Sequence, residues 1–414
     1  MPTDPTYLIV GASLCGAKAA ETLRGEGFGG TVILLGGETE RPYERPPLSK
    51  GYLLGKDDKS VIYVHEEGWY AEHDVDLRLG VTVTSVDPAG RTVTTADGES
   101  VGYDRLLLAT GASPRRLNIP GADREGVLYL RTVGDSERLA AAFRGGGRVV
   151  TVGAGWIGLE TTAAAREAGC EVTVVEPEPT ALYRALGSEL GEMFTDLHRE
   201  HGVEFRFGES VSEIRGPGAG GGAGQVGEVI TSSGAVVAAD LVVVGIGAVP
   251  NTGLAADAGL EVGNGVVADA ALRTSDTSIY AAGDVANSYH PLLGRRVRVE
   301  HWANALSAGP AAARSMLGQD VAYDPVPYFY SDQYDLGMET AGLPEPGTYD
   351  QVLYRGDRPG REFVAFWLAG GAVVAGMNVN VWDVSEQIGA LIRSRAVVDP
   401  ARLADPGVPL DELV

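Results

Sequence analysis

Two glycine-rich turns constrain the fold of this 414-residue chain more than any other feature of its sequence. Each turn follows a short apolar run and precedes a segment with helical periodicity; the first turn spans residues 11–16 and the second spans residues 153–158. A strand, a glycine turn and a helix in this order are typical of nucleotide-binding units with parallel strands. The sequence therefore predicts an α/β fold with two Rossmann-like units.

The second turn carries the complete pattern G-x-G-x-x-G between a predicted strand and a predicted helix over residues 157–168. Glycines at these positions allow a tight turn, the close approach of a pyrophosphate and the packing of helix on strand. Glu176 ends the next strand, where a carboxylate can bind the adenine-ribose hydroxyls and repel the extra phosphate of NADPH. These features predict an NADH site at Gly153, Gly155, Ile157, Gly158 and Glu176.

The first turn differs from this pattern because a serine replaces the second glycine. A serine is small, and its hydroxyl can itself donate to a phosphate. Glu38, which follows the second strand of this unit, is the acidic residue nearest to the position that binds ribose. The first turn thus predicts another dinucleotide site, at Gly11, Ser13, Cys15, Gly16 and Glu38.

Three further segments carry a resemblance to a known superfamily. One strand ends in Ala-Thr-Gly at 109–111, a second segment reads Gly-Ile-Gly-Ala-Val-Pro-Asn at 245–251, and a third leads into Gly-Asp at 283–284. With the two turns, these resemble the two-dinucleotide-binding-domain flavoproteins, the pyridine nucleotide–disulfide oxidoreductase superfamily. The resemblance implies FAD as a cofactor, with an aspartate on its ribityl chain.

A longer sequence motif makes the resemblance more specific within this superfamily. Residues 41–50 read Arg-Pro-Tyr-Glu-Arg-Pro-Pro-Leu-Ser-Lys, which is similar to the ferredoxin reductases of oxygenase systems; residues 129–132, 300–305 and 328–334 support the likeness. The FAD contacts that the resemblance implies are Gly11, Cys15, Gly16, Arg45, Lys50, Val83, Arg131, Asp284 and Trp302. The residues expected to line the flavin domain and its crossover are Ala109, Thr110, Gly111, Gly245, Gly247 and Gly283.

The same resemblance implies catalytic roles for Lys50 and Glu160. Hydride transfer from a nicotinamide to a flavin needs close stacking of the two rings and no protein nucleophile or base. Lys50 is expected near the central flavin nitrogen, with Glu160 as its partner, so that the pair holds the nicotinamide amide. Without the resemblance, a solvated lysine and an exposed helix acid are the simpler interpretation.

The domain organisation follows from the order of these motifs. We expect a discontinuous FAD-binding domain of residues 1–113 and 245–322, an NAD-binding domain of residues 114–244, and a smaller C-terminal α+β interface domain of residues 323–414. The C-terminal domain is predicted from alternating strands, among them residues 363–367 and 373–375, and from a closing helix over 385–392. The glycine-rich stretch 216–224 predicts a flexible hairpin loop.

The electron acceptor is inferred from the cysteines. The chain has two cysteines, Cys15 and Cys170, and they form neither a redox-active Cys-x-x-Cys pair nor a zinc-binding pattern. Cys15 is interpreted as a small residue packed beside FAD. Electrons must therefore pass from the flavin to an external acceptor, which the resemblance implies is an iron–sulfur ferredoxin that supplies a monooxygenase or dioxygenase. Arg295, Arg296 and Arg298 form a basic cluster that could attract an acidic ferredoxin, and Tyr330 is expected on the exit route.

Two alternatives stay open at this point. The nearer one is an NADH-dependent reductase of rubredoxin, of a quinone or of monodehydroascorbate. The more distant one is an apoptosis-inducing-factor-like flavoprotein that acts by binding a partner. The net charge of −23 argues against nucleic acid and anionic membranes as partners. The sequence shows no apolar run of membrane-spanning length and no signal-peptide pattern, so we expect a cytoplasmic protein with no metal site.

Overall fold

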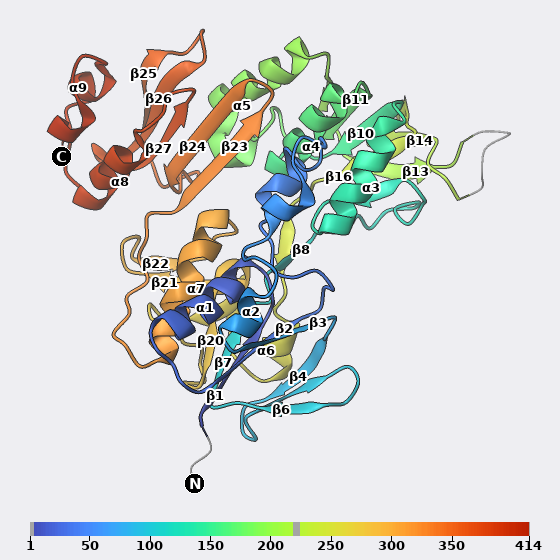
Figure 1. Cartoon of the computed structure of the whole chain (residues 1–414). Coiled ribbons are helices and arrows are strands. Elements are labelled where there is room, and N and C mark those ends of the chain that lie inside the picture. Colours follow the sequence, from blue (N-terminus) through green and yellow to red (C-terminus); the bar gives the residue numbers. More distant parts are fainter. Residues whose placement is uncertain (1–3, 218–223, 414) are drawn as a thin grey trace. The chain divides into compact units, whose positions relative to one another are not determined.

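The computed structural model describes residues 4–217 and 224–413, which form two compact units (Figure 1). Unit 1 contains Met1–Glu44, Lys59–Ser113 and Val249–Tyr328, and unit 2 contains Arg45–Asp58, Pro114–Ala248 and Phe329–Val414. The expected α/β class with two Rossmann-like sheets is confirmed. The chain passes between the units in two short strands, β8 (Ala112–Pro114) and β17 (Ala248–Pro250).

Residues 45–58 belong to unit 2, whereas the expected boundaries placed them in the FAD-binding domain. The hydroxyl of Ser136 donates to the carbonyl of Leu48 at 2.8 Å, and Leu53 is buried in the hydrophobic core of unit 2. These contacts anchor the 3-10 helix η1 (Pro46–Ser49), which begins with two prolines of fixed φ. The segment therefore packs with residues that lie about a hundred positions further along the chain.

A five-stranded parallel sheet forms the centre of unit 1. Its order is β20 (Ile279–Ala281), β7 (Arg105–Leu108), β1 (Thr6–Val10), β2 (Thr31–Gly36) and β3 (Val75–Leu79). Ile9 faces a core that includes α1 (Leu14–Gly25) and α7 (Trp302–Met316), while Leu8 and Val10 face a second core. Helices α1 and α7 lie side by side on one face of the sheet (Figure 1). Parallel sheets buried on both faces in this way read as continuous apolar runs.

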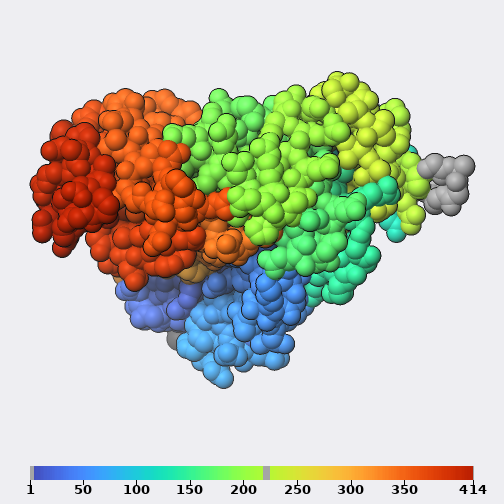
Figure 2. Space-filling view, turned by 90° about the horizontal axis from the view of Figure 1, so that it is seen from above, coloured from blue at the N-terminus to red at the C-terminus, as the bar shows by residue number. Residues whose placement is uncertain are grey.

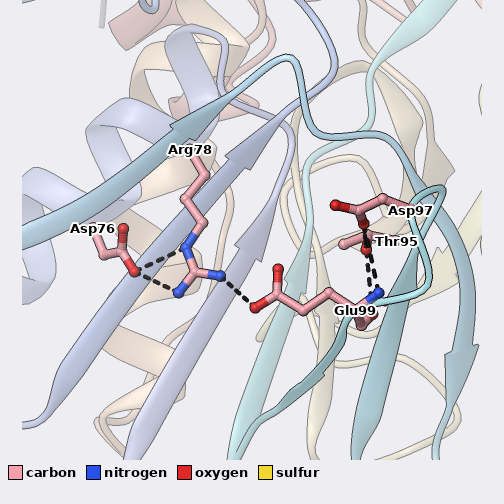
Figure 3. Close-up of polar contacts among 5 residues, drawn as sticks. All are labelled: Asp76, Arg78, Thr95, Asp97 and Glu99. Carbon is pink, nitrogen blue, oxygen red and sulfur yellow. Dashed lines mark hydrogen bonds and ion pairs between the residues drawn. The ribbon is translucent and has the colours of Figure 1, made fainter.

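A small antiparallel sheet packs on the other face of the parallel sheet of unit 1. It consists of β4 (Val83–Asp87), β5 (Thr92–Thr95) and β6 (Ser100–Gly102). Figure 3 shows how Arg78 of β3 connects to this sheet: its guanidinium contacts Asp76 at 2.7 Å and Glu99 at 3.0 Å. Thr95 donates to Asp97 in the turn before β6. These ion pairs are exposed, so they order the hairpin but add little stability.

The remaining elements of unit 1 lie mainly in its later segment. A four-stranded sheet contains β18 (Val262–Gly263), β19 (Gly265–Ala268), β21 (Ala286–His290) and β22 (Arg295–Val297). The short helical elements are η2 (Lys59–Ile62), α2 (Trp69–Glu72), α6 (Gly253–Asp257) and η3 (Gly283–Val285).

Unit 2 repeats the parallel arrangement. Its sheet has the order β12 (Glu204–Phe207), β11 (Glu171–Glu176), β10 (Arg148–Val152), β16 (Leu241–Val244) and β9 (Val127–Tyr129). The helices of this part are α3 (Val133–Arg144), α4 (Trp156–Glu167) and α5 (Tyr183–Glu200). A separate sheet contains β13 (Val211–Arg215), β14 (Glu228–Thr231) and β15 (Val236–Ala238). The expected loop 216–224 lies mostly outside the described residues.

The C-terminal segment forms a five-stranded sheet in the order β23 (Tyr328–Gln333), β24 (Leu336–Gly342), β27 (Ala372–Val379), β26 (Glu362–Ala369) and β25 (Gln351–Asp357). The predicted closing helix is present as α8 (Ser385–Ser394), and α9 (Pro400–Ala404) and η4 (Leu410–Leu413) follow it without having been predicted. One core joins this sheet to the parallel one, since it contains both Phe194 and Trp367. Figure 2 shows the orange and red C-terminal segment beside the green residues of α5.

Candidate functional site

The three glycines of the second turn have different neighbours. A Cβ atom added at Gly158 would lie 2.1 Å from the carbonyl oxygen of Gly153, and one added at Gly153 would lie 2.5 Å from that of Gly245. At Gly155 the nearest atom would be 3.9 Å away. Protein packing thus requires the first and third glycines, whereas the space beside the second is open. An open space at this position fits a pyrophosphate that approaches the backbone closely.

The first turn of α4 is prepared for an anion. Among the described residues, no side chain caps this helix, and its first turn contains no acidic residue. In the same unit, α3 has a complete capping box between Thr132 and Asp135. The uncapped N–H groups and the positive end of the helix dipole therefore remain for a phosphate at α4. Ile157, in this first turn, is 43% exposed.

Glu176 lies beside the glycine turn. Its carboxylate accepts hydrogen bonds from the backbone N–H groups of Ala154 at 2.6 Å and Glu178 at 3.0 Å. These bonds orient the side chain at the end of β11, where the adenine ribose of a dinucleotide would lie. The one cation close to it in sequence, Arg184, is paired with Glu178 at 2.7 Å.

The glycine turn of unit 1 has the same features as that of unit 2. A Cβ atom at Gly11 would lie 2.1 Å from the carbonyl oxygen of Ala109, and one at Gly16 would lie 2.1 Å from that of Gly11. Ser13, at the second glycine position, is the N-cap of α1 but makes no side-chain capping bond. Helix α1 has no acidic residue in its first turn. The two required glycines, the uncapped helix and a hydroxyl at the turn together fit the pyrophosphate of FAD.

Other predicted residues gather around this turn. Cys15 is buried, and a Cβ atom at Gly283 would lie 3.2 Å from its sulfur. Burial raises the pKa of the Cys15 thiol, so this side chain stays protonated and unreactive. Thr110 is held by Asn251, whose side-chain amide donates to the Thr110 carbonyl at 2.8 Å. The structure agrees with the interpretation of Cys15 as a packed residue.

The remaining predicted FAD residues of unit 1 are spread over several elements. Asp284 is half-buried in η3, and Val83 begins β4. Trp302 begins α7, and its indole N–H donates to the Glu44 carboxylate at 3.1 Å. Glu38 accepts a hydrogen bond from the Tyr43 hydroxyl at 2.5 Å. Gly111 has a φ of +67°, which favours glycine at the end of the Ala109–Gly111 segment.

Lys50 and Glu160 form a buried ion pair within unit 2. The ammonium nitrogen of Lys50 lies 2.6 Å from Oε1 of Glu160, and their side chains are 16% and 4% exposed. Lys50 directly follows η1, and Glu160 lies in α4, two residues beyond the glycine turn. The ring centroid of Tyr330 lies 5.5 Å from the Lys50 ammonium. The expectation that these two residues are partners is met, while the simpler interpretation of two solvated side chains is wrong.

Unit 2 also holds the other predicted residues. Arg45 donates to the backbone carbonyl of Arg131. A Cβ atom at Gly245 would lie 3.0 Å from Gly158, so this glycine allows β16 to pack against the start of α4. Gly247 has a φ of +95°, in the region that favours glycine.

The basic cluster is smaller than the sequence indicated. Arg298 pairs with Glu300 and donates to Asn264 at 3.1 Å, and its side chain is 11% exposed. Arg295 is half-buried and Arg296 is exposed, both on β22. The Arg296 guanidinium also donates to the backbone carbonyl of Ala268. With Arg298 paired to Glu300, Arg295 and Arg296 are kept as candidates for contact with an acidic partner.

Sequence reasoning missed two hydroxyl groups that contact Glu160. Ser49 donates to Oε2 of the carboxylate, and Ser331 donates to Oε1 at 2.7 Å. Both lie inside motifs that had been used only for the family resemblance. A buried serine next to a functional residue is the signal that could have pointed to Ser49, but Ser331 is 171 positions away from Glu160.

The described residues contain neither a helix that could span a membrane nor a cluster of metal ligands. No helix in residues 4–217 and 224–413 has both the length and the apolar character required to span a membrane. Over the same residues, no group of three or more His, Cys, Asp or Glu side chains is arranged to hold a metal ion.

Known proteins resemble the chain along its whole length. The pyridine nucleotide-disulphide oxidoreductase family model matches residues 5–309, and a model described as reductase C-terminal matches residues 328–414. The ferredoxin–NAD(+) reductase component of the anthranilate 1,2-dioxygenase system of Burkholderia cepacia is 41% identical, over 99% of both chains. A rubredoxin–NAD(+) reductase of Pseudomonas putida is 38% identical, over 84% of this chain and 88% of its own.

Solved structures agree with the sequence matches. The crystal structure of the covalent complex of putidaredoxin reductase with putidaredoxin superimposes with a TM-score of 0.94 and 35% identity. The match covers 99% of this chain and 98% of that chain.

Proposed function

The chain belongs to the pyridine nucleotide-disulphide oxidoreductase family, and from this membership we propose that it is an NADH-dependent ferredoxin reductase that serves an oxygenase. The family implies FAD and a nicotinamide dinucleotide as cofactors. The observation that carries the proposal is the match over 99% of both chains to a ferredoxin reductase of a dioxygenase system. Bound FAD would accept a hydride from NADH and release the electrons one at a time.

We assign FAD to unit 1. Gly11, Ser13 and Gly16 would hold its pyrophosphate at the N-terminus of α1, and Asp284 would bind the ribityl chain. The buried, protonated Cys15 would supply bulk beside the cofactor, without acting as a nucleophile. Arg45 and Arg131 of unit 2 remain proposed FAD contacts, as do the other residues that the family resemblance implies.

We assign NADH to the glycine turn of unit 2. The open side of Gly155 would admit the pyrophosphate, and Glu176 would accept hydrogen bonds from the adenine-ribose hydroxyls. The same carboxylate would lie close to the 2′-phosphate of NADPH and repel it. Arg184, the neighbouring cation, is paired with Glu178.

Lys50 and Glu160 would orient the nicotinamide end of NADH. An ammonium and a carboxylate held 2.6 Å apart present both a donor and an acceptor to a carboxamide. The burial of Glu160 strengthens these contacts, since the local dielectric constant around its carboxylate is low. Neither residue has to transfer a proton during hydride transfer, so positioning is their whole contribution.

An external one-electron acceptor is favoured by the cysteines. Cys15 and Cys170 are the two cysteines of the chain, both are buried free thiols, and they form no Cys-x-x-Cys pair that could receive the electrons. A ferredoxin is the acceptor in the name of the Burkholderia cepacia relative, whose match covers 99% of both chains. Arg295 and Arg296 would contribute positive charge for an acidic ferredoxin, in a chain whose net charge is −23.

Rubredoxin is the second candidate acceptor. The rubredoxin reductase relative shares 38% identity, but over a smaller part of both chains than the ferredoxin reductase. The expected three-domain division, with boundaries at 113/114, 244/245 and 322/323, stays part of the proposal, except that residues 45–58 group with unit 2. The cytoplasmic location also stays part of the proposal.

Steady-state NADH oxidation tests the proposal, with cytochrome c reduction as the readout. We expect rapid reduction only when a ferredoxin is added, and a lower rate when rubredoxin or a quinone replaces it. Equal rates with and without ferredoxin would contradict the assignment of the acceptor. A chain that binds no FAD after reconstitution would contradict the whole proposal.

A further inference from the structure

A chain of buried polar side chains ends at the Glu160 carboxylate. It begins on α5, where His198 contacts Gln333 at 2.8 Å, and it continues along β23, where Gln333 donates to Ser331 at 3.1 Å. Ser331 then donates to Oε1 of Glu160 at 2.7 Å. His198 and Ser331 are fully buried, and Gln333 is 1% exposed.

The strand geometry places these groups on one face. Side chains in a strand alternate between two faces, so Ser331 and Gln333 point the same way while Asp332 points the other way. Ser331 and Gln333 are buried and Asp332 is exposed. The edge strand of the C-terminal sheet thus turns two polar side chains towards α4 and α5, although apolar residues fill most of that core.

The hydrogen bonds run in one direction. Burial lowers the pKa of His198 to about 4, so its ring is neutral at pH 7 and carries one N–H group. The arrangement that satisfies every group has the His198 Nε2–H donating to the Gln333 carbonyl oxygen and the Gln333 amide donating to Ser331. The Tyr334 hydroxyl lies 3.3 Å from the other ring nitrogen, Nδ1, and donates to it. Every donor therefore points towards the carboxylate, which is where negative charge needs support.

The Glu160 carboxylate is consequently held from three sides. Oε1 receives the Ser331 hydroxyl and the Lys50 ammonium, and Oε2 receives the Ser49 hydroxyl. A carboxylate with both oxygens bound cannot rotate without breaking a charge-assisted hydrogen bond. Of these three contacts, Ser331 is the one that comes from the C-terminal sheet.

We propose that Ser331, supported by Gln333 and His198, is a positioning residue that sets the orientation of the Glu160–Lys50 pair for the nicotinamide. The inference rests on the proposed function, because it assumes that this pair meets the nicotinamide end of NADH. It gives the C-terminal sheet an indirect part in nicotinamide binding, through its contact with Glu160.

The test compares NAD⁺ with ADP-ribose, which has the same adenosine and pyrophosphate but no nicotinamide. Both ligands are titrated by calorimetry into the FAD-loaded chain and into Ser331→Thr and Ser331→Val. These two variants have the same shape and differ only in the hydroxyl. We expect Ser331→Val to raise the NAD⁺ dissociation constant about tenfold, as loss of a hydrogen bond to a charged group would, and to leave ADP-ribose binding unchanged. Ser331→Thr should stay close to the wild type.

A matched control is available in the same sheet. The hydroxyl of Thr340 on β24 is buried and has no hydrogen-bond partner among the described residues. Thr340→Val should therefore leave the binding of both ligands unchanged. Should Ser331→Val not fold, Gln333→Met removes the next link of the chain and is expected to weaken NAD⁺ selectively as well.

The outcomes separate the two proposals. Equal NAD⁺ binding by the Thr and Val variants would overturn the positioning role, and so would a parallel loss of NAD⁺ and ADP-ribose binding. A wild-type chain that binds neither ligand would overturn the proposed function and this inference together. An anaerobic stopped-flow measurement of flavin reduction by NADH gives a second readout, in which Ser331→Val should be slower than Ser331→Thr.

Discussion

Alanine substitution at two glycines of the second turn should separate ligand binding from packing. Gly155 has a φ of −79°, a value that alanine adopts freely, and a Cβ atom there would meet nothing closer than 3.9 Å. At Gly158 the added Cβ would lie 2.1 Å from the Gly153 carbonyl oxygen, well inside contact distance. The two variants add the same methyl group three residues apart.

The expected effects on stability differ in sign. Overpacking of a tight contact costs about 2 kcal/mol in the free energy of unfolding, so Gly158→Ala should lower the melting temperature by about 4–8 °C. Gly155→Ala restricts the unfolded chain without straining the folded one, which raises the free energy of unfolding by roughly 0.5 kcal/mol. Its melting temperature should stay equal to that of the wild type or rise slightly.

Gly155→Ala, which should not lose stability, should nevertheless lose affinity for the dinucleotide. The methyl group of Gly155→Ala would fill the space that the pyrophosphate needs, and loss of one charge-assisted hydrogen bond costs roughly 1.5–3 kcal/mol. We expect the dissociation constants of both NAD⁺ and ADP-ribose to rise by at least about tenfold. Calorimetric titration measures them, and thermal unfolding without ligand measures stability. Unchanged binding of both ligands by a folded Gly155→Ala variant would refute the assignment of the pyrophosphate to this turn.

Three more outcomes are expected. Glu176→Ala should lower the preference for NADH over NADPH, and an unchanged ratio of the two kcat/KM values would contradict the ribose assignment. Charge reversal at Arg295 and Arg296 should raise the KM for ferredoxin most strongly at low salt, with the KM for NADH as the internal control. Burial lowers the pKa of His198 and of His301 to about 4. Since both rings are neutral when folded, unfolding takes up protons below about pH 6.5, and the free energy of unfolding should fall towards pH 4 by up to about 1.4 kcal/mol per pH unit for each ring. Urea unfolding should show a weaker pH dependence for His198→Gln, and an identical dependence would show that this ring does not titrate as described.

Local sequence was sufficient to predict the two glycine turns and the helices that follow them. The helix expected over residues 157–168 is Trp156–Glu167, and the strand expected over 148–152 is Arg148–Val152. Residues that are neighbours in the chain encode the strand, the helix and the turn between them, in which Gly153 has a positive φ. Such signals require no knowledge of distant contacts.

Contacts between distant segments could not be read in this way. The hydrogen bond from Ser331 to Glu160 joins two residues 171 positions apart. The sequence around either residue does not predict this contact. The change of unit at residues 45–58 likewise depends on Ser136 and the core around Leu53. Arg298 was expected in a basic cluster because the run 295–298 is rich in arginine, yet Glu300, two residues further on, pairs with it.

The two cysteines have a practical consequence for labelling. Cys15 is 6% exposed and Cys170 is fully buried, and burial raises the pKa of both thiols. Thiolate-directed reagents should therefore leave the native chain unmodified. A cysteine introduced at an exposed position would then be its only reactive thiol, so a fluorophore or a spin label could be attached to the folded protein at one chosen site, with no need to replace either native residue first.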